Sequence, residues 1–329
     1  MNLNRIIVLI CAAGALIVIG GSALDPAAQS GVNVQVAGAI LPSATLTLVP
    51  TSVPTSTVTS TGTPTSTATP LPTATRSLTP TATRTRLPVP TGNPASRVIR
   101  VPILMYHYIS VPPPDADKYR LDLSVLPDAF ETQMDYLAIN GYHPIRLLDL
   151  AEYLLRGTAL PDKPIVLTFD DGYADNYANA FPVLRNHKFT GTFFVITQFV
   201  DENRWGYMNW AQLEEMAKAG MEIGSHSLDH PELRGKSRAF QFHQLVDSKQ
   251  MIETRLGTSV WSFAYPAGKY DANTISVLGS GGYLSAVTEI QGTNQSSDHL
   301  YEFQRIRIRG SYTIMDFEHW LKWFLENGK

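Results

Sequence analysis

Short apolar runs alternate with stretches of helical periodicity from about Arg97 to the end of the chain. The runs predicted as strands are 101–106, 165–169, 192–196, 221–225, 260–265, 283–287 and 305–309. The segments predicted as helices are 128–140, 147–155, 177–186, 210–219, 240–256, 271–278 and 316–326. Such alternation is typical of a mostly parallel sheet covered by helices. We therefore predict an α/β fold, a (β/α) barrel, in a single domain over residues 97–329.

Residues 1–25 have the pattern of a transmembrane or signal helix. The segment from Ile6 to Leu24 is apolar or small throughout, with Arg5 before it and Asp25 after it. About 20 apolar residues span a bilayer as a helix. We expect an uncleaved signal anchor, with a cleaved signal peptide as the alternative. In both cases the positive charge stays inside, so the rest of the chain is exported, either anchored at the outer face of the cell membrane or secreted.

The only cysteine, Cys11, lies in this apolar segment, so no disulfide can form within the chain. We interpret Cys11 as an ordinary apolar cysteine. The alternative interpretation, a lipoprotein signal, is less favoured because Ile10 stands where a small residue is expected.

Residues 26–96 are predicted to be a disordered linker. From about residue 41 to residue 94 the sequence is dominated by Thr, Ser and Pro, with few large apolar residues and no acidic ones. Such a segment cannot bury enough surface to offset its ordering entropy. The formal net charge of the whole chain is −3, so no basic excess indicates a nucleic-acid partner.

Two adjacent carboxylates, Asp170 and Asp171, follow the apolar run 165–169 and precede Gly172. They would lie at the carboxyl end of a buried strand, where parallel α/β folds gather their polar sites. Successive strand side chains point in opposite directions and glycine permits a sharp turn, so the two carboxylates can take different roles. For this motif alone, a simple turn is the competing interpretation.

Two histidines four residues apart, His226 and His230, follow a second apolar stretch, 221–224. Pro231 disfavours helix at His230, so we expect a loop or a single turn. Asp171 with these two imidazoles is a ligand set that suits Zn²⁺ and leaves coordination positions open for water and substrate. Co²⁺, Ni²⁺ or Mn²⁺ could bind the same set. The sequence therefore predicts one divalent metal ion with a hydrolytic role.

Residues 168–172 (TFDDG) and 226–230 (HSLDH) resemble the first two motifs of the polysaccharide deacetylases, carbohydrate esterase family 4, which includes the nodulation chitooligosaccharide deacetylases. The resemblance extends over roughly residues 103–324. It implies a distorted (β/α)₇ barrel and metal-dependent hydrolysis of N-acetyl or O-acetyl groups on a polysaccharide. By motif, Asp170 resembles the general base, and Asp171, His226 and His230 resemble the metal ligands.

The third family motif contains an arginine and ends in Pro, an aromatic residue and Gly. The corresponding segment here, 263–268 (FAYPAG), lacks the arginine, and Ala267 replaces the aromatic residue. The family uses the backbone N–H at that position as an oxyanion donor, which survives a change of side chain. Pro266, Ala267 and Tyr173, the residue after Gly172, are therefore the candidates for contact with the acetyl group or the rest of the substrate.

The family's usual carboxyl-terminal Leu-x-His motif, which supplies the general acid, is absent. Residues 104–107 (LMYH) instead resemble the subgroup of exported poly-N-acetylglucosamine deacetylases, in which the motif order is circularly permuted and this histidine is the acid. We expect His107 to be the acid, with His299, or a purely structural role for His107, as alternatives. His319 lies on the amphipathic last helix and is expected at the surface.

Arg305, Arg307 and Arg309 alternate, which places them on one face of the last predicted strand. Our hypothesis is that Arg305 replaces the missing motif arginine, orients Asp170 and favours its charged form. A solvated strand face is the competing interpretation.

Three aromatic residues, Trp205, Tyr207 and Trp210, could stack on sugar rings, although core packing is the commoner fate of such residues.

These residues predict a hydrolysis in which Asp170 takes a proton from a water activated by the metal and His107 protonates the leaving amine or alkoxide. The leading hypothesis is removal of N-acetyl groups from a glucosamine-containing polymer such as peptidoglycan or an exopolysaccharide. The alternatives are an O-acetyl esterase acting on xylan-like glycans and an inactive carbohydrate-binding relic. We expect a monomer whose partners are the polysaccharide and, through the amino-terminal helix, the membrane.

Overall fold

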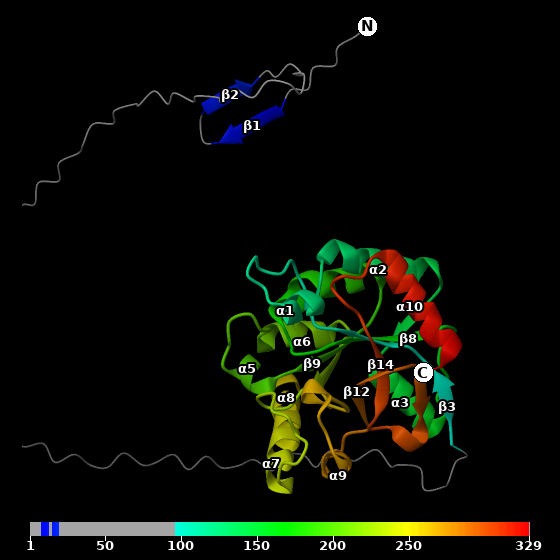
Figure 1. Ribbon diagram of the computed structural model, residues 1–329. Coiled ribbons are helices and arrows are strands. Elements are labelled where there is room, and N and C mark those ends of the chain that lie inside the picture. Colours follow the sequence, from blue (N-terminus) through cyan, green and yellow to red (C-terminus); the bar gives the residue numbers. More distant parts are fainter. Residues whose placement is uncertain (1–7, 13–14, 20–95, 329) are drawn as a thin grey trace, which may run out of the picture. The chain divides into compact units, whose positions relative to one another are not determined.

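The computed structural model describes residues 8–12, 15–19 and 96–328, and the predicted linker 26–96 lies almost entirely outside them (Figure 1). In the predicted signal segment the described residues form two strands, β1 (Val8–Ala12) and β2 (Ala15–Ile19), paired antiparallel. This corrects the prediction of helix there. These stretches are rich in Val and Ile, whose branched side chains favour strands. Within the described parts of the chain, none of the helices has the length and apolar character needed to cross a bilayer.

A sheet of eight parallel strands forms the centre of the globular unit. Their order is β4 (Ile103–Tyr106), β14 (Phe303–Arg307), β12 (Ser285–Gln291), β11 (Ser262–Ala264), β10 (Glu222–Ser225), β9 (Thr192–Val195), β8 (Pro164–Phe169) and β7 (His143–Ile145). Because β4 also pairs with β8, the first seven strands of this order close into a ring. The predicted seven-stranded (β/α) barrel is therefore confirmed, with β7 added outside the ring.

The barrel is distorted at two places. One edge of β8 is shared, since residues 164–166 pair with β7 whereas Thr168 and Phe169 pair with β9. The pairing of β12 with β14 shifts register between Val287 and Gln291. Both irregularities involve strands that carry residues of the site described below.

Helices cover the outside of the barrel (Figure 1). The longer ones are α2 (Pro127–Ile139), α3 (Leu147–Arg156), α4 (Phe181–His187), α6 (Trp210–Lys218), α8 (Ser248–Leu256), α9 (Ala272–Ser280) and α10 (Ile314–Asn327). Two predicted helices contain a π-helical turn: η1 (Asn176–Ala180) precedes α4, and η2 (His243–Asp247) lies between α7 (Arg238–Phe242) and α8. Shorter elements that the sequence analysis missed are α1 (Lys118–Leu123), α5 (Thr197–Asp201), the pair β3 (Val98–Arg100) and β13 (Asn294–Ser296), the pair β5 (Tyr108–Ile109) and β6 (Ser124–Val125), and the 3₁₀ turns η3 (Pro266–Gly268) and η4 (Ser297–His299).

The amino ends of the strands are tied to α3. Thr192 and Glu222, the first residues of β9 and β10, accept hydrogen bonds from the backbone N–H groups of Leu147 and Leu148. Ser262, the first residue of β11, donates to the same Glu222 carboxylate. The apolar side of α3 belongs to the same buried cluster as side chains from six strands of the ring, at positions 103, 166, 194, 264, 287 and 303. This end of the barrel is therefore a packed core, and the opposite end is left for chemistry.

Candidate active site

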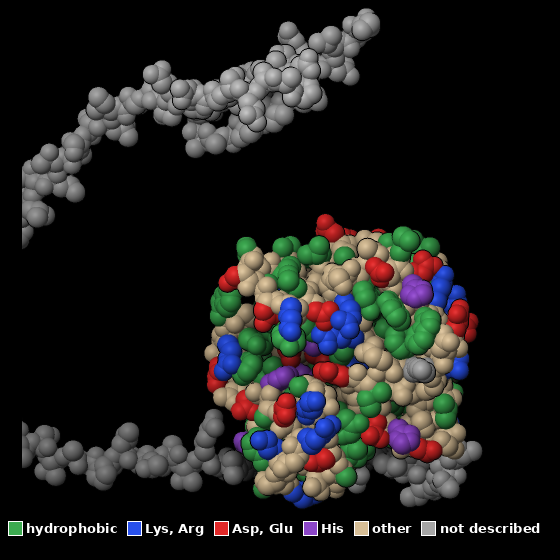
Figure 2. All heavy atoms as spheres, viewed as in Figure 1, with side chains coloured by type: hydrophobic (Ala, Val, Ile, Leu, Met, Phe, Trp, Pro, Cys, Tyr) green, Lys and Arg blue, Asp and Glu red, His purple; other side chains and the backbone are tan. Residues whose placement is uncertain are grey.

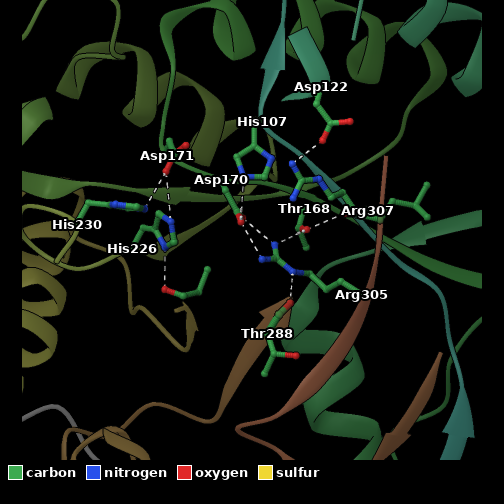
Figure 3. A network of polar contacts seen from close by, with 12 residues as sticks. His107, Asp122, Thr168, Asp170, Asp171, His226, His230, Thr288, Arg305 and Arg307 are labelled. Carbon is green, nitrogen blue, oxygen red and sulfur yellow. Dashed lines mark hydrogen bonds and ion pairs between the residues drawn. The ribbon is translucent and has the colours of Figure 1, made fainter. Parts of the chain in front are cut away.

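The Asp-Asp-Gly motif turns sharply at the carboxyl end of β8. Asp171 and Gly172 both have positive φ, 72° and 77°. Two consecutive left-handed residues are costly except for glycine, so the turn is a strained feature of the kind found at functional sites. It directs the two buried carboxylates apart: Asp170 faces β14, whereas Asp171 faces the histidine loop after β10 (Figure 3).

Asp171, His226 and His230 form a compact cluster of ligand atoms. The Oδ1 of Asp171 lies 3.3 Å from Nε2 of His226 and 3.4 Å from Nε2 of His230. One ligand atom from each residue lies within 4.8 Å of the other two. The predicted metal ligands therefore come together, although Asp171 and His226 are fifty-five positions apart in the chain.

The surroundings of His226 suit a metal ligand. Its Nδ1 lies 2.7 Å from the carbonyl oxygen of Ala264, which can only accept, so Nδ1 carries the proton and Nε2 offers its lone pair. This fixing of the imidazole by a backbone carbonyl is typical of histidines that bind metals. A carboxylate and two imidazole nitrogens converging at one point fit Zn²⁺ or a similar divalent cation. These three residues would hold the ion.

The histidine loop is shaped by its own backbone. Ser227 and His230 have φ values of 69° and 65°, and the Ser227 hydroxyl oxygen accepts a hydrogen bond from the His230 N–H. Gln244 accepts from the N–H of Leu228 and so ties the loop to η2. The expected loop is therefore a tight and strained turn that brings both imidazoles to Asp171.

Charge and burial decide the ionisation of the cluster. Burial raises the pKa of Asp171, but its hydrogen bond with His226 and the nearby imidazoles outweigh this, so its pKa lies well below the ordinary value. Burial lowers the pKa of His230 to about 4, helped by the charge of His226. Burial also opposes the charged form of His226, yet the two carboxylates raise its pKa. The carboxylate is thus ionised, as a metal ligand must be.

Asp170 is held by Arg305 in a buried, two-pronged ion pair. Arg305 Nη1 and Nη2 donate to Oδ1 and Oδ2 of Asp170, each at 2.8 Å. Arg305 Nε donates to the Thr288 carbonyl at 2.8 Å, and Nη1 also contacts the Thr168 hydroxyl at 3.2 Å. Burial works against the charge on Asp170, but the Arg305 charge and hydrogen bonds hold its pKa below the ordinary value. The hypothesis that Arg305 orients Asp170 therefore has a direct geometric basis.

The other two arginines of the predicted face do not reach the carboxylate pair. Strand β14 ends at Arg307, not at Arg309 as predicted. Arg307 and Arg309 donate to the two carboxylate oxygens of Asp122, at 2.6 and 2.9 Å. The shared face of alternating arginines is thus divided between the buried Asp170 and the half-buried Asp122.

His107 follows β4 directly and lies over the carboxylate pair (Figure 3). Its Nε2 is 4.0 Å from Oδ2 of Asp170. Burial lowers the pKa of His107, with Arg305 and Arg307 acting in the same direction and the two aspartates opposing it. The alternative acid, His299, lies in η4 and contacts Glu302 at 3.0 Å, outside this group of residues.

The candidate substrate residues lie in the loops around the cluster. Pro266 is buried and Ala267 exposed in η3, the turn after β11, and Ala267 has a strained φ of 50°. Tyr173 stacks on Tyr108 with ring centroids 3.6 Å apart. Figure 2 shows histidine and acidic side chains together in a hollow of this face.

The aromatic candidates divide into different roles. Trp210 is partly buried and donates from Nε1 to Asp201 at 3.0 Å, which is a structural role. Tyr207 packs beside Tyr173, and Trp205 is almost fully exposed.

Sequence reasoning missed the residues that fasten the His107 segment. Asn176 in η1 is fully buried, and its Nδ2 donates to the His107 carbonyl at 2.7 Å. The neighbouring Asp175 accepts from the Ser110 hydroxyl at 2.6 Å and from the Ile109 N–H at 3.2 Å. The only available signal was their position three and four residues after Gly172 of the Asp-Asp-Gly motif, because bonds to backbone groups leave no pattern in the partner sequence.

Comparison with known proteins relates this chain to one enzyme family. A model of the polysaccharide deacetylase family matches residues 157–286, which contain Asp170, Asp171, His226 and His230 but neither His107 nor Arg305. YxkH of Bacillus subtilis (strain 168), which is named as a polysaccharide deacetylase, is 31% identical over 209 residues, 64% of this chain and 71% of that protein.

Two further deacetylases are similar to this chain. The poly-β-1,6-N-acetyl-D-glucosamine N-deacetylase of Staphylococcus aureus (strain MSSA476) is 27% identical over 60% of this chain and 71% of its own length. The solved structure of the Streptococcus pyogenes deacetylase PplD in complex with acetate superposes with a TM-score of 0.63 and 28% identity, covering 68% of this chain and 98% of that one.

A parallel barrel with carboxylate, imidazole and guanidinium groups gathered at the carboxyl ends of its strands is the architecture of a barrel enzyme. The similarity to YxkH over most of that protein then assigns the family. The chain belongs to the polysaccharide deacetylase family and is a hydrolase of that family.

Proposed function

We propose that this deacetylase removes N-acetyl groups from a glucosamine-containing polysaccharide and releases acetate, with one divalent cation held by Asp171, His226 and His230. The observation that carries the proposal is the juxtaposition of two carboxylates with separate partners. Asp171 belongs to the imidazole cluster, whereas Asp170 is gripped by Arg305 and lies 4.0 Å from His107.

The cation, when bound, supplies a Lewis acid that polarises water and the acetyl carbonyl. Asp170 is the proposed base, and the support is that Arg305 keeps it ionised and fixes the direction of its oxygens. His107 is the proposed acid that protonates the leaving nitrogen, because expulsion of an amine is slow without a proton donor. The backbone N–H of Ala267, in the strained turn after β11, is the proposed oxyanion donor.

The substrate we propose is a β-1,6-linked poly-N-acetylglucosamine. The support is the name of the Staphylococcus aureus relative, which spans a similar domain, together with a histidine at the end of the first barrel strand in place of the usual carboxyl-terminal one. Export of the enzyme, by which it would meet such a polymer, stays a prediction from the apolar segment and the Thr/Ser/Pro-rich linker.

The test is an acetate-release assay on the full chain, with and without chelator. The substrates are β-1,6-linked poly-N-acetylglucosamine, peptidoglycan fragments and acetylated xylan. We expect acetate release from the glucosamine polymer. This release should stop with chelator, return with added Zn²⁺ or Co²⁺, and be abolished by Asp170→Asn. Release from xylan alone would replace the proposal by an O-acetyl esterase. If neither wild type nor Asp170→Asn releases acetate from any of these glycans, the result would favour the alternative of an inactive carbohydrate-binding relic.

A further inference from the structure

The His107 imidazole is not held by hydrogen bonds of its own. In residues 96–328 its ring contacts Asp170 at 4.0 Å, which is longer than a hydrogen bond (Figure 3). The hydrogen bond from Asn176 reaches the His107 carbonyl and not its ring. A ring without a bonded partner takes its position from the backbone that carries it. The contacts of residues 107–110 therefore decide where the proposed proton donor lies.

The π-helical turn η1 holds one side of this segment. Asp175 Oδ1 accepts from the Ile109 N–H at 3.2 Å, and Asp175 Oδ2 accepts from the Ser110 hydroxyl at 2.6 Å. Asn179 Nδ2 donates to the Ile109 carbonyl at 2.7 Å. Side chains of this turn and of the residue before it thus bind backbone and hydroxyl groups just after His107.

Arg120 on α1 holds the segment from another side. Its guanidinium carbon lies 3.1 Å from the ring centroid of Tyr108, the residue after His107. Its Nη2 donates to the Ser110 hydroxyl oxygen at 3.1 Å, and that hydroxyl donates in turn to Asp175. The Ser110 hydroxyl therefore bridges a cation on α1 and a carboxylate beside η1.

The charge of Arg120 is not used in a direct ion pair with any residue of 96–328. Its Nη1 is buried and has no hydrogen-bond partner in this part of the chain. A buried N–H group without an acceptor costs free energy, so the flat contact with Tyr108 is maintained against a cost. The contacts that Arg120 does make are therefore directed at the segment that carries His107.

Helix α1 is itself firmly attached, so it can act as a support. Asp117 caps it by accepting from the Arg120 N–H at 2.7 Å. At its other end the Gly310 N–H donates to the Asp122 carbonyl at 2.8 Å, and β6, which follows α1, pairs with β5. The support therefore reaches from the His107 segment to the loop after β14, the strand that carries Arg305.

We propose that Arg120 is a positioning residue for His107. Stacked on Tyr108 and bonded to Ser110, it holds the segment against η1 and so fixes the direction in which the imidazole faces the leaving nitrogen. The inference rests on the proposed function for the role of His107 as the acid. Arg120 transfers no proton, so its loss should slow only those reactions that need the acid.

The test compares an amide substrate, an acetylated glucosamine oligomer, with an aryl acetate whose nitrophenolate leaves without protonation. We expect Arg120→Met to lower kcat for the amide about tenfold and for the aryl acetate less than about twofold, with KM and metal content unchanged. Arg120→Lys keeps the charge but cannot stack on Tyr108 and reach Ser110 together, so it should behave like Arg120→Met. Ser110→Ala, which removes the bridge, should act in the same direction.

The matched control is Arg238→Met. Arg238 also donates to serine hydroxyls, those of Ser276 and Ser280 on α9, but it is exposed, and its loss should leave both rates at the wild-type value. In a His107→Ala background, Arg120→Met should have no further effect on the amide, because the acid is already absent. Equal losses on amide and ester, additive losses in the double variant, or a raised KM for the oligomer would overturn the positioning role.

Nitrogen NMR of the imidazoles in the full chain separates this inference from the proposed function, because it does not require turnover. Arg120→Met should shift or broaden the His107 resonance, assigned by its loss in His107→Ala, whereas Arg238→Met should leave it unchanged. An unchanged resonance in Arg120→Met would overturn the positioning role even if acetate is released. If wild type releases no acetate but the resonance changes in Arg120→Met, the positioning role stands and the proposed reaction fails.

Discussion

Arg305 and Asp170 meet in a parallel, two-pronged ion pair whose four atoms are all buried, with both N–O distances at 2.8 Å. The arginine comes from β14 and the aspartate from the end of β8, two strands that both pair with β4 and so lie on opposite sides of it. The pair thus fixes the direction of the carboxylate across the barrel mouth. A buried pair of this kind is costly to break, because the partner left behind keeps its charge without compensation.

We therefore expect Arg305→Met to lower the free energy of unfolding by about 3–5 kcal/mol. Arg305→Lys keeps the charge but loses the fork, so the protein should fold while kcat falls at least about tenfold. Thermal unfolding and acetate release with metal content held equal would measure both effects. The matched control is Arg309→Met, since Arg309 is half-exposed in its pair with Asp122. This substitution should lower the free energy of unfolding by about 0–1 kcal/mol. Equal losses in the two Met variants would contradict the proposed role of Arg305.

Removal of either imidazole should empty the candidate metal site. His226→Ala and His230→Ala leave two ligands of three, and we expect metal affinity to fall by at least about 100-fold. Elemental analysis of the purified variants, with acetate release in parallel, measures this. His299→Ala is the control, because that side chain is exposed and contacts Glu302 instead of the cluster. Variants of His226 or His230 that keep stoichiometric metal would refute the ligand assignment.

His107 should be needed for turnover and not for metal. Its Nε2 faces Asp170 at 4.0 Å, whereas the ligand atoms of the cluster come from three other residues. We expect His107→Ala to retain bound metal and to lose about 10²- to 10⁴-fold in turnover of amide substrates. An ester with a good leaving group needs less help from an acid and should lose less. A variant with wild-type turnover of amides would show that another group is the acid.

Asn176 should act through the position of His107. Its buried amide donates to the His107 carbonyl, and Asn176→Ala removes this bond without touching the acid itself. We expect kcat to fall about tenfold with KM and metal content unchanged, since small displacements of a catalytic group are costly. Asn327→Ala on α10, which removes an exposed amide bonded to Trp323, is the control for general loss of an amide. A fall in thermal stability with unchanged kcat would instead make Asn176 purely structural.

The barrel was predictable because its strands are buried on both faces. In β8 and β9 this gives continuous apolar runs. Strand β7 was missed because its sequence, His143-Pro144-Ile145, has neither an apolar run nor alternation. The two π-helical turns were missed for a different reason: their side-chain pattern is that of an ordinary helix.

The grouping of Asp171, His226 and His230 followed from one rule, that carboxyl ends of parallel strands meet at one edge. The partner of Asp170 could be stated as a hypothesis because the usual motif arginine was missing and alternating arginines stood elsewhere. The strained turns could not be predicted. Asp171, Ser227, His230 and Ala267 have positive φ without being glycine, so their conformations are imposed by the surrounding contacts and leave no local signal.

At the amino end of the barrel, Glu222 should make stability depend on pH. Its buried carboxylate accepts bonds from the Ser262 and Thr192 hydroxyls and the Leu148 N–H. Burial raises its pKa above the ordinary value of 4.5, and these three bonds only partly oppose the rise. The folded state therefore binds the proton more tightly than the unfolded state. Stability contributed by this group is full below about pH 4.5 and declines as the pH rises through the folded-state pKa.

Glu222→Gln removes the titration while keeping hydrogen-bonding atoms, because a glutamine carbonyl can accept from Leu148 and Thr192 and its amide can donate to the Ser262 oxygen. We expect thermal unfolding of this variant to change less between pH 5 and about 7.5 than that of wild type. Acetate release should be unchanged, since the residue lies at the end of the barrel opposite the metal cluster. Glu214→Gln, at an exposed ion pair on α6, is the matched control and should follow wild type. A Glu222→Gln variant that is destabilised equally at both pH values would mean that the ionised carboxylate itself stabilises the end of α3.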